Sequence, residues 1–74
     1  MLADGTYDVI VVDASAIPDG PDDLRLDLTI LAGEHKGEVV PMRASGLGVD
    51  EVDVLGVPGT LTVLGGAPSI VLDR

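Results

Sequence analysis

Three serines of this chain are available as hydroxyl nucleophiles: Ser15, Ser45 and Ser69. None of them lies in a nucleophile-elbow motif, and a serine nucleophile also needs a neighbouring base. The only histidine, His35, lies in a turn bracketed by Gly33 and Gly37, and the chain contains no cysteine. We therefore expect no catalytic residues and predict that the chain is not an enzyme.

Two groups of carboxylates could coordinate a hard cation through oxygen ligands. They are Asp19, Asp22 and Asp23 in the first group and Asp50, Glu51 and Asp53 in the second. Neither group has the spacing of an EF-hand loop. The first surrounds a Pro/Gly turn, where aspartates commonly stabilise the turn, and the second suits the first turn of a helix through the helix dipole. We expect no metal site and no cofactor.

The charge balance limits the possible partners. Thirteen acidic residues face four basic ones, which gives a formal net charge of −9. Such a field repels phosphate backbones and anionic membrane surfaces, so nucleic acid is a possible but disfavoured partner and a membrane is not expected. The longest apolar run, residues 9–12, is far too short to span a bilayer, and we predict a cytoplasmic protein.

The apolar residues are almost all Val, Leu, Ile and Ala, with Tyr7 as the only aromatic residue, and this composition favours strands. Residues 5–14 are rich in β-branched side chains and predict a first strand. Residues 17–23 contain proline and glycine at turn-forming positions and predict a loop that reverses the chain.

The second predicted strand, residues 24–31, shows the clearest alternation in the sequence. Four apolar side chains share one face and are expected to fill the core: Leu24, Leu26, Leu28 and Ile30. A glycine-bracketed turn at 33–37 leads into a third strand, residues 38–44. Pro41 cannot donate to a ladder, so this strand is predicted to lie at an edge or to be bulged.

Residues 45–59 change their period, because Val49, Val52 and Leu55 lie three residues apart with acidic residues between them. This spacing predicts one or two helical turns that end near Gly56 and Pro58. Residues 60–64 and 67–72 then predict a terminal hairpin around a Gly-Gly turn.

The element order is therefore three strands, a short helix and two strands. It predicts an all-β fold, namely one OB-like domain over residues 1–74, a small five-stranded Greek-key barrel with a short helix between the third and fourth strands. An SH3-like barrel is the alternative.

Three segments carry a family resemblance: Gly5-x-Tyr7-x-Val9-x-Val11, then Leu24-x-Leu26-x-Leu28-x-Ile30, and Gly33-x-x-Lys36-Gly37-x-Val39. Over about its first half, the chain resembles OB-fold-like phage and bacterial proteins associated with single-stranded DNA. The resemblance implies a binding module without catalysis and with possible DNA contact.

Single-strand binders combine a basic groove with aromatic side chains on which bases stack. The residues of this chain that could serve are Tyr7, Arg25, His35, Lys36 and Arg43. The turn around His35 and Lys36 could also bind a small anion through its backbone amides, or it could be a plain hairpin turn.

Apolar residues outside the predicted core are the remaining signal. Four of them are candidates for a protein-interaction surface: Leu31, Val39, Leu64 and Val71. We therefore expect an interaction module that binds a protein partner or forms a homo-oligomer through an apolar face. The alternative function is a single-stranded nucleic-acid-binding accessory protein.

Overall fold

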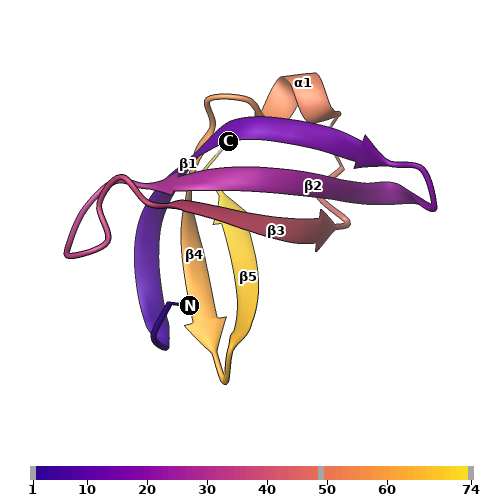
Figure 1. Ribbon diagram of the computed structural model, residues 1–74. Helices are drawn as coiled ribbons and strands as arrows, with labels where there is room; N and C mark the ends of the chain where they lie inside the picture. The colour runs from indigo at the N-terminus through magenta and orange to yellow at the C-terminus, as the bar shows by residue number, and fades with distance from the viewer. Residues whose placement is uncertain (1, 49, 74) are drawn as a thin grey trace.

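The computed structural model describes residues 2–48 and 50–73 (Figure 1). Its elements are β1 (Gly5–Ile17), β2 (Gly20–Ile30), β3 (Val39–Ser45), α1 (Glu51–Val54), β4 (Pro58–Leu64) and β5 (Ala67–Leu72). All paired strands are antiparallel, and their order in the sheet is β3-β2-β1-β4-β5. Because β1, β2 and β3 follow one another and β4 returns beside β1, this order is a Greek key. The chain forms the all-β, OB-like Greek-key fold expected from its element order, with the short helix between β3 and β4, and its five strands curl into a half-barrel.

Strand β1 belongs to both halves of the barrel. Residues 5–10 pair with β4, and residues 9–17 pair with β2. The register shifts between Val11 and Asp13, so that Val12 forms a β-bulge, and bulges bend a strand. Figure 1 shows β1 running beside β4 in its first half and along β2 in its second half. This bend curls the sheet around its inner face.

The inner face holds the core, and the alternating residues of β2 form its centre. The four predicted core residues Leu24, Leu26, Leu28 and Ile30 are all buried, which confirms the prediction. They pack with Val9, Val11, Met42, Ala44, Val54, Leu61 and Val63. Each fully buried side chain of this size contributes roughly 1.5–3 kcal/mol to folding. Among the described residues, every buried side chain in this core is apolar.

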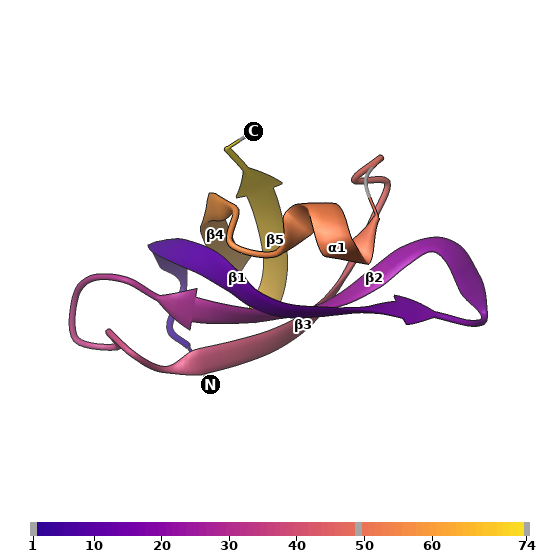
Figure 2. The ribbon, with the colours of Figure 1, turned by 90° about the horizontal axis from the view of Figure 1, so that it is seen from above.

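Helix α1 is a single turn beside β1, as Figures 1 and 2 both show. Its core residue is Val54, whereas Val52 and Leu55 are exposed. The spacing of Val49, Val52 and Leu55 therefore predicted a helix here but did not identify the side chain that it buries. Of these three residues, Val49 lies outside the described residues. The chain after α1 is fixed on β1, because the amide of Gly56 donates to the carbonyl of Val11 over 2.8 Å. No helix within the described ranges has the length and apolar character needed to cross a membrane.

The β1–β2 connection is tighter than predicted. Residues 17–23 were expected to form a loop, but Ile17 pairs with Gly20, so only two residues make the turn and β2 begins at Gly20. Pro41 lies on β3, which is an edge strand as predicted. Strand β4 begins at Pro58, two residues earlier than the predicted strand.

The predicted β4–β5 hairpin is confirmed and is fastened to the start of the chain. Gly65 and Gly66 form its turn with φ values of +59° and +81°, a backbone region that glycine adopts without strain. Both turn amides donate to the carboxylate of Asp4, over 3.0 and 3.4 Å. The side chain of Asp4 therefore accepts hydrogen bonds from two turn amides that have no acceptor within the hairpin itself.

Candidate functional site

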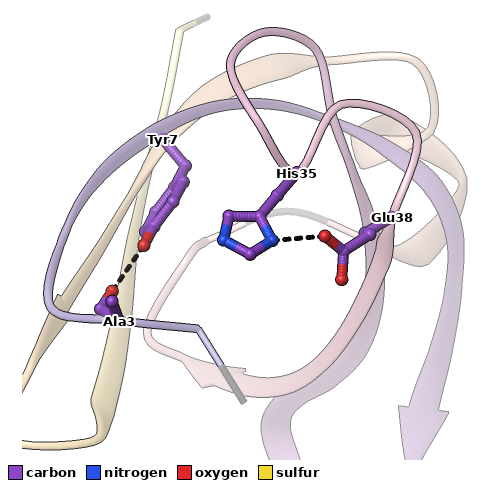
Figure 3. Close-up of polar contacts among 4 residues, drawn as sticks. All are labelled: Ala3, Tyr7, His35 and Glu38. Carbon is purple, nitrogen blue, oxygen red and sulfur yellow. Dashed lines mark hydrogen bonds and ion pairs between the residues drawn. The ribbon is translucent and has the colours of Figure 1, made fainter.

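Tyr7 and His35 lie together where the β2–β3 loop meets β1 (Figure 3). Their ring centroids are 6.1 Å apart in a T-shaped arrangement. The Tyr7 hydroxyl donates to the carbonyl of Ala3, and His35 Nδ1 is hydrogen-bonded to a carboxylate oxygen of Glu38. A shallow pocket of 290 Å³ beside them is also lined by Asp8. The aromatic ring is therefore engaged locally and has acidic neighbours.

The turn that carries His35 and Lys36 uses its amides internally. The amides of Lys36, Gly37 and Glu38 donate to carbonyls within the turn or at the end of β2, over 2.8–3.2 Å. An anion-binding turn needs successive amides that point outward together. The observed hydrogen bonds therefore favour the plain hairpin turn.

Arg25 and Arg43 lie directly opposite each other on the outer face of β2 and β3, the face turned away from the core. Each is next to a carboxylate: Arg43 Nε donates to Asp23 Oδ2 over 2.7 Å, and Arg25 Nη2 is 3.9 Å from Asp27 Oδ1. These carboxylates offset the repulsion expected between two like charges on neighbouring strands. They also reduce the positive potential that a phosphate backbone would meet.

The five candidate nucleic-acid residues consequently fall into two groups. Arg25 lies opposite Ser15 on β1, and Tyr7 lies eight residues earlier on the same strand. At about 3.3 Å per residue, this separation is about 26 Å of strand. Tyr7 and His35 thus lie together, with Lys36 next to His35 in the turn, and the two arginines form a separate group on the outer face.

The two carboxylate groups, which are far apart in the sequence, partly converge. A pocket of 490 Å³ is lined by Asp22 from the first group and by Asp50, Glu51 and Asp53 from the second. Its apolar wall includes Ala16 and Leu24. Within the described ranges, no three acidic or histidine side chains are close enough together to hold a metal ion.

The four candidate interaction residues are all exposed. Leu31, directly after β2, lies opposite Asp8 on β1, because the Leu31 amide donates to the Asp8 carbonyl. Asp8 in turn lies opposite Thr60 on β4, and Thr60 lies opposite Val71 on β5. Leu64 lies at the hairpin end of β4. Polar residues therefore separate Leu31 from Val71, whereas Val39, opposite Thr29 on β2, is a diagonal neighbour of Leu31.

Sequence reasoning missed three further exposed apolar residues: Val12, Val52 and Leu55. Val12 follows Val11, and Leu55 precedes Gly56, so both flank the hydrogen bond that fixes α1 on β1. The bulge that turns Val12 outward leaves no signal in an apolar run. For Val52 and Leu55, one helical turn is too short to define a buried face.

The open side of the barrel lies between its two edge strands, β3 and β5. No pairing joins them in the described part of the chain, although their Cα atoms come within 8 Å of each other. A groove of 240 Å³ separates them, lined by residues 42–45 and Leu47 on one side and by residues 68–70 on the other. The barrel therefore leaves two strand edges unpaired on this side, with Leu47 and Ile70 half-buried beside them.

The fold and this surface define a small OB-like β-barrel with an open side. No protein-family model, curated protein or solved structure matches the chain.

Proposed function

We propose that this chain is a non-enzymatic interaction module that binds a partner protein through apolar side chains exposed on the surface of its half-open barrel. The observation that carries the proposal is the exposure of seven large apolar side chains, each between 42% and 72% exposed, among the described residues. They are Val12, Leu31, Val39, Val52, Leu55, Leu64 and Val71. An apolar patch on a small domain marks an interaction site, and Val12 and Leu55 are brought together by the hydrogen bond between Gly56 and Val11.

The positions of the polar groups support a role without catalysis. His35 is engaged with Glu38 in a loop, and the three serines are exposed on three different strands. A nucleophile and its base would have to lie within hydrogen-bond reach of each other. The carboxylate of Glu38 would not prevent His35 from acting as a base, but in the described part of the chain no hydrogen bond joins His35 to a serine.

The charge indicates the kind of partner. With a net charge of −9, the chain attracts cationic surfaces and repels a second copy of itself. A protein with a basic surface is therefore favoured over a homo-oligomer.

A cytoplasmic location of the chain belongs to this proposal, and cell fractionation tests it.

Photo-crosslinking in the native host tests the proposal. A photoreactive amino acid replaces Val52 or Val71, two of the most exposed apolar residues, and Asp19 on the β1–β2 turn is the control position. We expect at least one apolar position to give a discrete adduct with a protein that the control position does not capture. That protein, purified, must then bind the chain in solution.

Two results would contradict the proposal. An adduct of two copies of the chain, together with a dimer in sedimentation velocity, would show that the exposed apolar side chains mediate self-association and not the binding of a partner protein. Uniform absence of adducts at the apolar positions would remove the support for a protein partner.

Single-stranded nucleic acid is the second candidate ligand. The observation in its favour is the position of Arg25 and Arg43 on the outer face of β2 and β3, the face that OB-folds use to bind oligonucleotides. An electrophoretic shift assay at low salt tests it with Arg25→Ser as the variant. Unretarded single-stranded DNA at high protein concentration would exclude this candidate.

A further inference from the structure

The two edges of the sheet differ in how well they are protected against pairing with another chain. Natural edge strands are commonly blunted by proline or by charged side chains. Strand β3 has both, with Pro41 near its middle and Arg43 two residues later. Strand β5 has no charged residue, and its only proline, Pro68, lies near its start. The second half of β5 is thus an unprotected edge.

The hydrogen-bond pattern shows which amides of β5 face outward. The amide of Asp73 donates to the carbonyl of Pro58 over 2.8 Å, so this opposite pair is a hydrogen-bonded one. Such pairs alternate along an antiparallel ladder, which makes Thr60 and Val71 the next hydrogen-bonded pair. The N–H and C=O groups of Ile70 and Leu72 consequently point away from β4, toward the open side.

Apolar side chains lie beside this edge. The side chain of Ile70 is half-buried and lines the groove between β5 and β3. Met42, Ala44 and Leu47 form the opposite wall. A strand added to β5 would turn every second side chain toward the groove beside the half-buried Leu47 and Ile70, because successive side chains point to opposite faces.

The charges around the edge select a cationic segment. Strands β4 and β5 and residues 5–10 of β1 contain no lysine or arginine, whereas Asp8 lies on this part of β1 and Asp73 directly follows β5. Arg43, which lines the groove from β3, is paired with Asp23. The field on this half of the barrel is therefore negative. A second copy of the chain would bring the same acidic half toward it, which disfavours pairing of β5 with itself.

We propose that the free edge of β5 binds an extended, cationic segment of the partner protein as an added antiparallel strand. This inference rests on the proposed function and specifies its binding mode. The segment pairs with Ile70 and Leu72, turns apolar side chains toward the groove and presents lysine or arginine side chains to the acidic outer surface. Since β3 approaches β5 to within 8 Å at the Cα atoms and the groove is lined by residues 68–70, the pairing is short and is centred on Leu72.

A peptide titration followed by NMR on the ¹⁵N-labelled protein tests the proposal. The probe is a capped seven-residue peptide in which lysine alternates with valine. We expect the amide signals of residues 69–73 to shift most and the affinity to fall as salt is added. A peptide with glutamate in place of lysine is expected not to bind.

Two N-methylated peptides separate strand pairing from charge alone. In an antiparallel pair, the residues opposite Ile70 and Leu72 turn their side chains to the same face as these two, so they are the valines of the probe. N-methylation of the valines removes the donors toward β5 and is expected to weaken binding about tenfold or more. N-methylation of the lysines leaves those donors intact and should change affinity less than about twofold.

On the protein, Ile70→Pro removes an outward donor without removing a hydrogen bond to β4, and it is therefore expected to weaken binding of the lysine–valine peptide.

Equal affinity of the two N-methylated peptides would overturn strand addition even if the Ile70→Pro variant does not fold. Shifts confined to α1 or to the β2–β3 loop would overturn the β5 site and leave a protein-binding function in place. Absence of any photo-crosslinked partner would instead remove the proposed function, and this inference with it.

Discussion

Replacement of Gly59 by alanine tests how tightly β4 and β5 are packed. Gly59 is buried between Val9 on β1 and Leu72 on β5. A Cβ atom at this position would lie 2.6 Å from the backbone oxygen of Val71, about 0.8 Å inside the 3.4 Å lower limit of ordinary contact. That oxygen belongs to the ladder and cannot rotate away, so β5 must move as a unit.

The expected loss combines two opposing terms. Overpacking of a well-packed site costs about 1–3 kcal/mol, and the reduced freedom of the unfolded chain returns about 0.4–1 kcal/mol. We expect Gly59→Ala to lower the free energy of unfolding by about 1–2 kcal/mol, which corresponds to a Tm lower by about 5–15 °C in a domain of this size. Urea denaturation and thermal melts followed by far-UV circular dichroism measure both quantities.

The matched control is Gly20→Ala. A Cβ atom there would also be crowded, at 2.7 Å from Asp23 Oδ2 and 2.8 Å from Arg43 Nη2. These atoms end flexible side chains near the surface, which can move apart at little cost because their ion pair contributes little. We expect a change within about 0.5 kcal/mol. If the two variants lost the same stability, the argument that backbone crowding at Gly59 decides the outcome would be wrong.

Other substitutions test separate parts of the structure by the same melts. Leu26→Ala empties the centre of the core and should lower the free energy of unfolding by about 2–5 kcal/mol. Leu64→Ala, on the exposed end of β4, should change it by no more than about 0.5 kcal/mol. Similar losses in the two variants would contradict the assigned inner face. Asp4→Ala removes the acceptor of the two turn amides and should cost less than about 1 kcal/mol, with faster amide exchange confined to the β4–β5 turn. Arg43→Met, which removes the pair with Asp23, should change stability by less than about 1 kcal/mol at low salt and not at all in 1 M salt.

The strands were predictable where local pattern and burial agree. Alternation over residues 24–30 identified the inner face of β2 because one buried face imposes a period of two. The Gly65–Gly66 turn was equally predictable from the sequence, since two adjacent glycines provide the positive φ values that a two-residue hairpin requires.

Element boundaries were less predictable because pairing decides them. Pro18 and Gly20 fit either a long loop or a tight turn, and the pairing of Ile17 with Gly20 settles the choice. The buried residue of α1 is Val54 because the chain after the helix is hydrogen-bonded to Val11, a contact between distant residues that no helical spacing reveals.

The arrangement of the surface residues was beyond sequence reasoning because it depends on strand register and on the bend of β1. The same register that sets Arg25 against Arg43 keeps both away from Tyr7. The approach of Asp22 to Asp50 around one pocket likewise follows from the curl of the sheet. Local patterns fix which residues are exposed, whereas long-range pairing fixes which of them meet.

The sharing of β1 between two halves of the barrel has a consequence for the folding kinetics. The β1–β2 and β4–β5 hairpins each close over a two-residue turn, whereas residues 5–10 must find residues 58–63 across nearly the whole chain. Closing so long a loop costs conformational entropy before its contacts form, which slows folding. We expect the docking of two preformed hairpins to limit the rate, on the millisecond-to-second scale of small β-barrels, with the bulge at Val12 marking their junction.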